Sequence, residues 1–283
     1  MTEIRHEEWK FDGKGGLSLY AQSWSPPDAR ARMIVVHGLG EHSGRYLNVV
    51  NYFCPRGFAV HGYDHRGFGK SPGTRAYTDS IDDYLDDLDA FLRQVRERTP
   101  AQPLVVVGHS MGGLIVLRWA ATRDPVVDAV VSSGAALEVS APVPGAKLLA
   151  ARIFSKIAPK LSMANEVDPA ALSHDPAVVQ AYVSDPLVIR KITARLAHEI
   201  IRSMGETLAQ AGRVRVPLLL LHGEADQLVA ASGSRKFHEA VPGNAKGLQT
   251  YPGFYHEIFN EVGKESVFKD IETWLAGALP PRA

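Results

Sequence analysis

Three shortages in the sequence exclude whole classes of protein. Cys54 is the one cysteine among the 283 residues, which excludes an intrachain disulfide and any zinc site built on several thiolates. Lys plus Arg and Asp plus Glu each number 31, so the formal net charge is +0, and the chain lacks the basic excess typical of nucleic-acid-binding domains. The longest apolar runs are far shorter than the ~20 residues of a membrane-spanning helix. We therefore expect a soluble globular protein that does not bind nucleic acid.

The N-terminal segment also lacks the apolar stretch of a signal peptide. Residues 1–13 instead carry several acidic and basic side chains, among them Glu3, Arg5, Glu8 and Lys10. We therefore expect no signal peptide and a cytoplasmic location. At about 150 residues per domain, a chain of 283 residues has room for one or two domains.

Strand and helix patterns alternate along the first half of the chain. Residues 4–11 and 17–24 alternate polar and apolar side chains, which is typical of antiparallel strands. Short apolar runs, typical of buried strands, then alternate with stretches of helical spacing; the runs lie at 33–36, 58–63, 104–107 and 129–131. This order predicts an α/β fold, with a mostly parallel sheet, antiparallel N-terminal strands and helices on both faces.

The alternation stops near Gly134. Residues 137–213 show helical patterns and no strand pattern, and the alternation resumes at 217–221. We therefore predict a core made of residues 1–136 and 214–283, with residues 137–213 inserted as a helical cap. An insertion over the carboxyl edge of a parallel sheet lies where such folds bind ligands.

The motif Gly-x-Ser-x-Gly, which marks the nucleophile of many serine hydrolases, occurs twice. In the first copy Ser71 is followed by Pro72, which has no N–H to offer an oxyanion. In the second copy, Ser110 lies between a buried strand and a helix that begins at about Met111. Strand, tight turn and helix are the setting of a nucleophile elbow. We therefore predict that Ser110 is the nucleophile and that Ser71 is a loop residue.

A serine nucleophile needs a base and an acid that orients the base. In the chain order typical of this motif, the acid comes next and the histidine last, each in the loop after a late strand. Asp226 follows the strand at 217–221 and His256 follows the strand at 247–251, so we predict these two residues for the roles. Glu224 is the alternative acid.

The loop after the strand at 33–36 predicts the second part of an oxyanion hole. The backbone N–H groups of Leu39 and Met111 are the expected donors. The same loop also resembles a dinucleotide-binding fingerprint, with Gly38-x-Gly40 followed by Asp64. That motif requires a third glycine where Ser43 stands, which makes a nucleotide site the weaker alternative.

Zinc-protease spacing is absent from the sequence. Each His-Glu pair is followed, four residues after the histidine, by a residue that is not a metal ligand in this motif; these residues are Lys10, Arg202, Pro242 and Asn260. We therefore expect neither a metal nor any other cofactor.

Several longer segments resemble the monoacylglycerol lipases, a group within the α/β-hydrolase fold. They include HGLGEHSGRY (37–46), DHRGFGKS (64–71), GHSMGG (108–113), YVSDPL (182–187) and YHEIFN (255–260). The resemblance implies a catalytic triad of Ser110, Asp226 and His256, with Leu39 and Met111 as oxyanion donors. It also implies that Glu41 and Arg45 shape the polar end where the glycerol moiety binds. A helix-terminal charge pair at i,i+4 is the alternative role for these two residues.

Residues 145–161 predict an amphipathic helix in the inserted segment. Leu149, Ile153 and Ile157 recur every four residues, and the basic Arg152, Lys156 and Lys160 follow another face. A basic amphipathic helix can lie transiently on a membrane surface. The alternative is an apolar face packed on the core, where it lines or supports the substrate tunnel, with a solvated basic face.

Together these features predict a cofactor-independent carboxylester hydrolase. The resemblance favours a single-chain acyl ester as substrate, most specifically a monoacylglycerol. A lysophospholipase, a general esterase or an acyltransferase with the same triad is the alternative enzyme. A binding protein on a hydrolase scaffold is the weaker alternative, because a binder needs no triad, elbow and oxyanion loop together.

Overall fold

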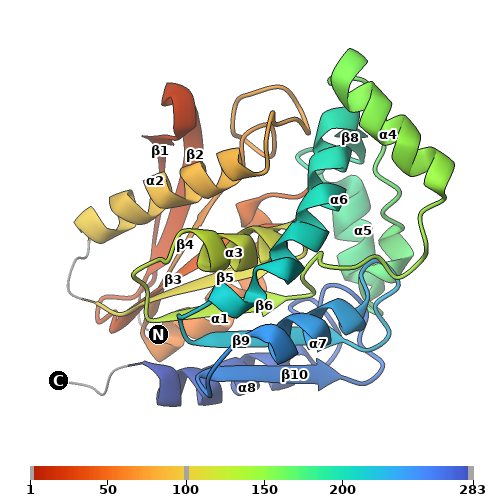
Figure 1. Cartoon of the computed structure of the whole chain (residues 1–283). Coiled ribbons are helices and arrows are strands. Elements are labelled where there is room, and N and C mark those ends of the chain that lie inside the picture. The colour runs from red at the N-terminus through yellow and green to blue at the C-terminus, as the bar shows by residue number, and fades with distance from the viewer. Residues whose placement is uncertain (1–2, 99–101, 280–283) are drawn as a thin grey trace.

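One mixed sheet runs through the middle of the molecule (Figure 1). The computed structural model describes residues 3–98 and 102–279; the ends of the predicted core, 1–2 and 280–283, lie outside them. Within the described residues, eight strands form the sheet in the order β1-β2-β4-β3-β5-β6-β9-β10. These strands are β1 (Arg5–Asp12), β2 (Ser18–Ser25), β3 (Ala31–Val36), β4 (Phe58–Tyr63), β5 (Leu104–His109), β6 (Ala129–Ser133), β9 (Leu218–Gly223) and β10 (Lys246–Tyr251).

The strand directions confirm the predicted fold class. β1 pairs antiparallel with β2, and β2 antiparallel with β4, whereas all other neighbours in the sheet run parallel. The parallel strands are continuous apolar runs because both faces of the sheet are covered. On β5, for example, Leu104 and Val106 belong to one hydrophobic cluster, and Val105 and Val107 belong to the other.

Helices cover both faces. The helices of the chain are α1 (Leu47–Phe53), α2 (Asp82–Arg98), α3 (Met111–Thr122), α4 (Gly145–Ile157), α5 (Pro176–Ser184), α6 (Ala194–Ala209), α7 (Ala231–Ala240) and α8 (Lys264–Ala278). Side chains of α1 and α8 pack into one cluster against the sheet, and those of α2, α3 and α7 pack into the other. The sheet is therefore sandwiched between two helical layers (Figure 1).

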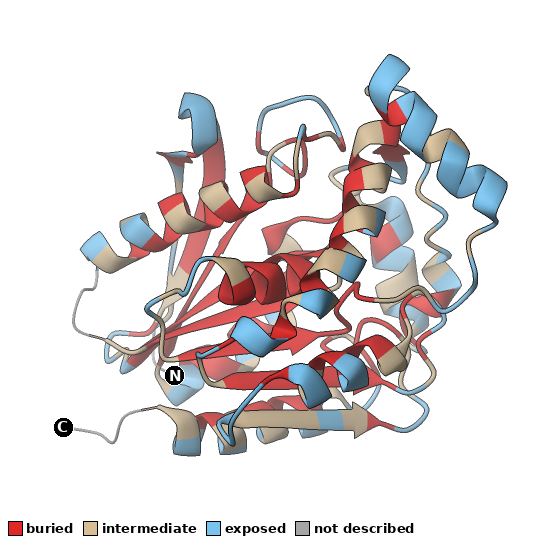
Figure 2. Ribbon diagram, in the orientation of Figure 1, coloured by how far each residue is buried: buried red, intermediate tan, exposed pale blue. Residues whose placement is uncertain are grey.

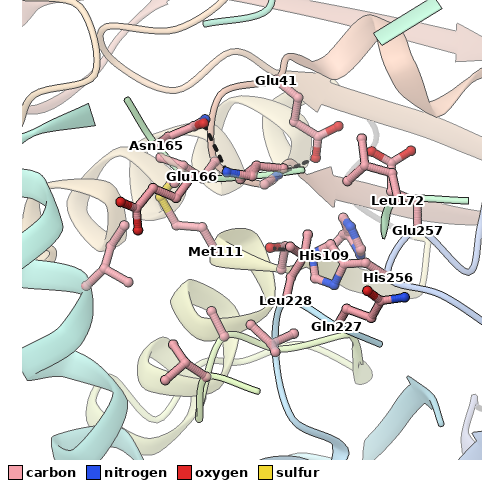
Figure 3. Close-up of a pocket in the computed structure, with 18 of the residues that line it drawn as sticks. Glu41, His109, Met111, Asn165, Glu166, Leu172, Gln227, Leu228, His256 and Glu257 are labelled. Carbon is pink, nitrogen blue, oxygen red and sulfur yellow. Dashed lines mark hydrogen bonds between the residues drawn. The ribbon is translucent and has the colours of Figure 1, made fainter. Parts of the chain in front are cut away.

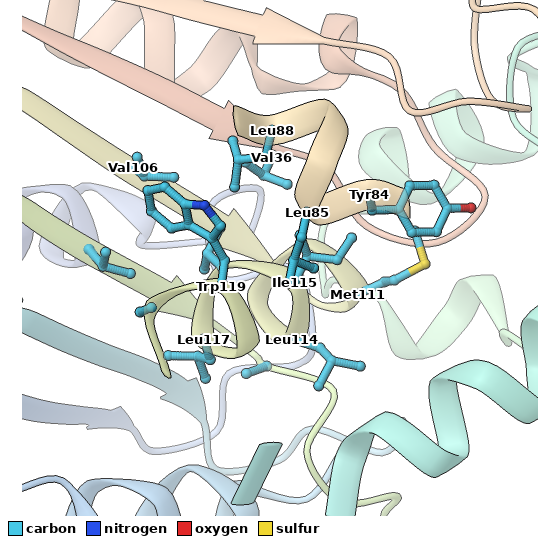
Figure 4. Packing of buried hydrophobic residues seen from close by; sticks show 14 of the residues in the cluster. Val36, Tyr84, Leu85, Leu88, Val106, Met111, Leu114, Ile115, Leu117 and Trp119 are labelled. Atoms are coloured by element: carbon cyan, nitrogen blue, oxygen red, sulfur yellow. The ribbon is translucent and has the colours of Figure 1, made fainter. Parts of the chain in front are cut away.

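Helix α3 is buried almost all round and fixes the turn that precedes it. Ile115 and Trp119 pack among Leu85 and Leu88 of α2 and the sheet residue Val106 (Figure 4). The Trp119 indole N–H also donates to Asp89 at 2.8 Å. Because a helix packed on every side cannot shift or rotate cheaply, its first turn holds one position over the end of β5.

The segment between β6 and β9 lies beyond the edge of the sheet at which the parallel strands end (Figure 1). It contains α4, α5 and α6, as the helical patterns predict. The expectation of no strand in residues 137–213 is wrong, because β7 (Ser162–Ala164) pairs antiparallel with β8 (Lys191–Thr193). Strands of three residues are too short for a period-two pattern to emerge in the sequence.

Helix α4 ends at Ile157, four residues before the predicted end, and its apolar side chains face outward. Leu149 is 57% exposed, Ile153 47% and Ile157 71%, and Figure 2 shows the helix exposed over most of its length. The alternative that this face packs on the core is therefore wrong. Lys160 lies beyond the helix, with its ammonium 5.5 Å from the centre of the Tyr77 ring. Among the described residues, no helix has the length and apolar character to cross a bilayer.

The tight packing at the start of α3 predicts opposite effects of two glycine substitutions on the free energy of unfolding. A Cβ on Gly112 would lie 2.0 Å from the Val36 carbonyl oxygen, whereas a Cβ on the exposed Gly205 of α6 would meet nothing within 4 Å. We expect Gly112→Ala to lower the free energy of unfolding by about 1–3 kcal/mol or more. Gly205→Ala should raise it by about 1 kcal/mol. Urea unfolding followed by circular dichroism measures both, and equal effects would contradict the packing.

Candidate active site

Ser110 lies in a sharp turn between β5 and α3. Its φ and ψ are 56° and −117°, a region that costs a non-glycine residue about 1–3 kcal/mol. The turn closes because Gly108 and Gly112 lack side chains: a Cβ on Gly108 would lie 2.3 Å from the Gly112 carbonyl oxygen. The Ser110 N–H donates to the Ser133 carbonyl at 2.9 Å. This geometry presents the Ser110 hydroxyl at the N-terminus of α3, where the helix dipole favours negative charge.

The loops after β9 and β10 bring Asp226 and His256 to this hydroxyl. His256 Nε2 lies 2.9 Å from Ser110 Oγ, and His256 Nδ1 lies 2.6 Å from Asp226 Oδ2. With Nδ1 protonated and donating to Asp226, Nε2 is free to accept the Ser110 proton. The three predicted residues thus form one continuous hydrogen-bonded chain, although Ser110 and Asp226 are 116 positions apart in the sequence.

Asp226 is a buried acceptor with every oxygen engaged. Its Oδ1 accepts from the N–H groups of Leu228 and Val229 at 2.9 and 3.0 Å. His222 Nε2 lies 3.3 Å from its Oδ2. Burial would raise the Asp226 pKa, but His256, His222 and these N–H groups hold it well below its usual range. The alternative acid, Glu224, pairs instead with Arg235 at the surface, so the geometry favours Asp226.

His256 is a buried base whose protonation depends on Asp226. Burial disfavours the imidazolium, but the Asp226 carboxylate outweighs burial and raises the His256 pKa above 6.5. His109 packs against His256 with ring centres 4.8 Å apart. Burial, with His256 nearby, lowers the pKa of His109 to about 4, so His109 is an uncharged wall of the site near neutral pH.

The loop after β3 passes directly against Ser110. A Cβ on Gly38 would lie 3.1 Å from the Ser110 Cβ. Within the described part of the chain, the N–H groups of Leu39 and Met111 have no protein acceptor, and both residues line the cavity at Ser110. Two free N–H groups beside a nucleophile are the donors that a developing oxyanion requires.

Glu41 holds this loop in place. Its Oε1 accepts from the Gly38 N–H at 2.6 Å and the Tyr46 hydroxyl at 2.7 Å, and its Oε2 accepts from Arg45 at 2.8 Å. Burial would raise the Glu41 pKa, but Arg45 and His109 are among the groups that hold it at about 2. The ion pair at i,i+4 therefore exists, and Glu41 also lines the cavity.

The sequence analysis missed Glu257, which completes this ion cluster. Both its oxygens accept from Arg45, at 2.7 and 2.9 Å, and the Arg45 guanidinium stacks 4.8 Å from the Tyr182 ring centre. Arg45 thus ties the loop after β3 to the loop that carries His256. Its sequence signals are its adjacency to His256 and its place in the segment YHEIFN (255–260), and neither signal points to Arg45 as its partner.

A cavity of about 320 Å³ opens at Ser110 (Figure 3). Its apolar wall comes mainly from the inserted segment; the side chains include Val139, Val143, Val167, Leu172, Ile200 and Met204. The polar side chains that line the cavity include Glu41, Asn165 and Glu257. None of the residues of α4 lines this cavity, so the expectation that Leu149, Ile153 and Ile157 could line the tunnel is wrong.

The remaining predicted residues have structural partners. Ser71 is buried, accepts from the Tyr20 N–H and donates to the Asp64 carbonyl. Asp64 accepts from the N–H and hydroxyl of Ser43 and from the Lys70 N–H, so its carboxylate has no free side for a ribose. Among the described residues, no cluster of His, Cys, Asp or Glu has the arrangement of a metal site.

Comparison with known proteins finds relatives over the whole length of the chain. The family model for the serine aminopeptidases S33 (Hydrolase_4) matches residues 27–263. A monoacylglycerol lipase from Mycolicibacterium smegmatis is 34% identical over 282 residues, which cover 99% of this chain and 100% of the relative. Phospholipase YtpA from Bacillus subtilis is 30% identical over 251 residues, covering 87% and 95%.

A solved structure agrees with these sequence matches. The crystal structure of a monoacylglycerol lipase from Paleococcus ferrophilus matches with a TM-score of 0.83 at 32% identity, covering 98% of this chain and 100% of that chain.

The Asp226 contact predicts the direction in which His256 titrates. We expect an NMR titration of the His256 imidazole to give a pKa above 6.5. Asp226→Asn removes the carboxylate, so burial should dominate and move the pKa below that of the unsubstituted protein. Glu224→Gln should leave it unchanged. The His256 signal is assigned by its loss in His256→Gln. A lower pKa after Glu224→Gln rather than Asp226→Asn would assign the acid to Glu224.

Proposed function

The chain belongs to the α/β-hydrolase family of the serine aminopeptidase S33 model, as its resemblance to monoacylglycerol lipases predicts, and we propose that it hydrolyses monoacylglycerols through an acyl-enzyme on Ser110. The observation that carries this proposal is the chain of hydrogen bonds from Asp226 through His256 to Ser110 at the mouth of a mainly apolar cavity.

Acylation begins when the Ser110 oxygen attacks the ester carbonyl and His256 Nε2 takes its proton. The carbonyl oxygen becomes an oxyanion that the N–H groups of Leu39 and Met111 stabilise. The tetrahedral intermediate collapses, the bond to the alcohol oxygen breaks, and His256 returns the proton to the leaving alcohol. Asp226 keeps the imidazole in the required tautomer and stabilises the imidazolium.

Deacylation repeats these steps with water as the nucleophile. His256 takes one proton from water as its oxygen attacks the acyl carbon, and the same two N–H groups hold the second oxyanion. The bond to Ser110 then breaks, and the proton on His256 passes to the Ser110 oxygen. The products are glycerol and a fatty acid, and the enzyme returns to its starting state.

The size and lining of the cavity support a substrate with one acyl chain. A volume of about 320 Å³ lies at the small end of the ~300–1,000 Å³ range of ligand sites. We infer that residues 137–213 act as a cap, because they supply most of the apolar wall and bond both loops of the site. The Ile189 N–H donates to the Gly40 carbonyl at 2.7 Å, and the Glu257 N–H to the Leu172 carbonyl at 2.8 Å.

A single-chain cavity predicts strong discrimination by the number of acyl chains. We expect monodecanoylglycerol to be cleaved far faster than di- or tridecanoylglycerol in the same detergent, because a second chain has no cavity to enter. Release of decanoic acid measures the rate. Ser110→Ala should lower kcat by about 10⁶-fold.

Ser71→Ala is the matched control for this experiment. It removes a buried hydroxyl with two partners, so it should lower the free energy of unfolding by about 1–3 kcal/mol. Because Ser71 does not line the cavity, kcat should stay within roughly a few-fold of the unsubstituted value. Rapid cleavage of tridecanoylglycerol would contradict the single-chain cavity. Retained activity in Ser110→Ala would contradict the mechanism.

The outward face of α4 supports transient contact with a membrane surface. Leu149, Ile153 and Ile157 are exposed, and so are the basic Arg152 and Lys156 of the same helix, which has no acidic residue. Moving each exposed apolar side chain from water into the acyl region of the bilayer is favourable, and each cation is attracted to anionic lipid. Contact at α4 would bring the neighbouring cavity close to lipid substrate.

This contact is tested by two variants of α4. We expect Leu149, Ile153 and Ile157, replaced together by Ser, to weaken sedimentation with vesicles of phosphatidylglycerol and phosphatidylcholine by about tenfold or more. Arg152 and Lys156, replaced together by Glu, should weaken binding to these vesicles but not to pure phosphatidylcholine. Hydrolysis of a water-soluble nitrophenyl butyrate should stay unchanged in both, because α4 does not line the cavity. Unchanged vesicle binding in both variants would refute the contact.

A further inference from the structure

The charged side chains that line the cavity are all acidic. Glu41, Glu166 and Glu257 contribute to its wall, and among the residues that the structure describes no lysine or arginine does. Resting on the proposed function, we propose that the alcohol end of this cavity accepts uncharged headgroups and rejects phosphate-bearing ones, and that Glu257 sets this specificity. The residue thereby separates monoacylglycerols from lysophospholipids that carry the same acyl chain.

The ion cluster behind the wall keeps a net negative charge. Glu41 and Glu257 share one cation, Arg45, and all three side chains are less than a tenth exposed. Arg45 donates three hydrogen bonds to the two carboxylates, and its guanidinium stacks on the Tyr182 ring. It does not itself line the cavity. An entering headgroup therefore meets carboxylate oxygens and not the guanidinium.

The cluster lies where the alcohol part of the substrate must bind. Glu41 bonds the Gly38 N–H, one residue before the oxyanion donor Leu39. Glu257 directly follows His256, which protonates the leaving alcohol. Both carboxylates thus belong to residues that lie beside groups acting on the ester, and we assign the alcohol part of the substrate to their side of the cavity. Glu166 also lines the cavity but is exposed and paired with Lys147, which leaves Glu257 and Glu41 as the buried charges.

Hydrogen bonding and charge both favour an uncharged headgroup over a phosphate beside these carboxylates. A carboxylate only accepts hydrogen bonds; a glycerol hydroxyl donates one, whereas an ionised phosphate offers only acceptors. Like charges a few ångströms apart in a partly buried site repel strongly, and salt screens them little. Because Glu41 also holds the oxyanion loop, Glu257 is the carboxylate that can be changed without releasing the Gly38 N–H.

The experiment separates charge from size with three substrates that share a decanoyl chain. They are 1-decanoylglycerol, 1-decanoylglycerol 3-phosphate, and the uncharged dimethyl ester of that phosphate, all in the same nonionic detergent. For the unsubstituted protein, kcat/KM for the dimethyl ester should exceed that for the phosphate by about tenfold or more. Glu257→Gln should reduce this ratio by about tenfold. Glu257→Asp, which keeps the charge, should retain most of it.

Glu272→Gln is the control for net charge. Glu272 lies on α8, where it pairs with Tyr52 and Arg56 away from the cavity, so the ratio should not change. Equal kcat/KM for the phosphate and its dimethyl ester in the unsubstituted protein would overturn the inference, even if Glu257→Gln does not fold. An unchanged ratio in a folded Glu257→Gln would overturn the assignment to Glu257. If no glycerol ester is cleaved, the proposed function itself fails, which is a distinct outcome.

Discussion

The strained backbone of Ser110 is the constraint on which the rest of the site depends. A side-chain-bearing residue at φ 56° persists only where its surroundings leave no alternative. Here β5 holds one side of the turn, the buried helix α3 holds the other, and Gly108 and Gly112 let the backbones meet. The packed core thus holds one half-buried hydroxyl at a helix N-terminus, beside the free N–H of Met111.

The other catalytic groups lie on loops that meet at Ser110. The parallel strands β3, β5, β9 and β10 end at one edge, so their loops deliver Leu39, Ser110, Asp226 and His256 to the same place. Arg45 ties the first of these loops to the last through Glu41 and Glu257. The same ion cluster therefore positions the oxyanion loop and gives the alcohol end of the cavity its charge.

The sequence predicted the parts whose signals are local. The elbow at Ser110 has a motif, Asp226 follows the apolar run of β9, and His256 follows the strand pattern of β10. The sequence did not predict β7 and β8, since three residues carry no period and their pairing is non-local. Nor did it predict the place of Glu257, and it left open whether the apolar face of α4 lies outward or packs on the core. Both depend on which partner lies opposite, and the residue's own neighbours do not encode that.

Covalent labelling tests whether Ser110 is the residue that carries the acyl group. A fluorophosphonate reacts with a serine only where a base activates the hydroxyl and N–H donors stabilise the oxyanion. After one equivalent of the reagent, we expect a single adduct, which peptide mass spectrometry should place on Ser110. Activity should be lost in proportion to labelling. An adduct on Ser71 or any other residue, or full activity in fully labelled protein, would contradict it.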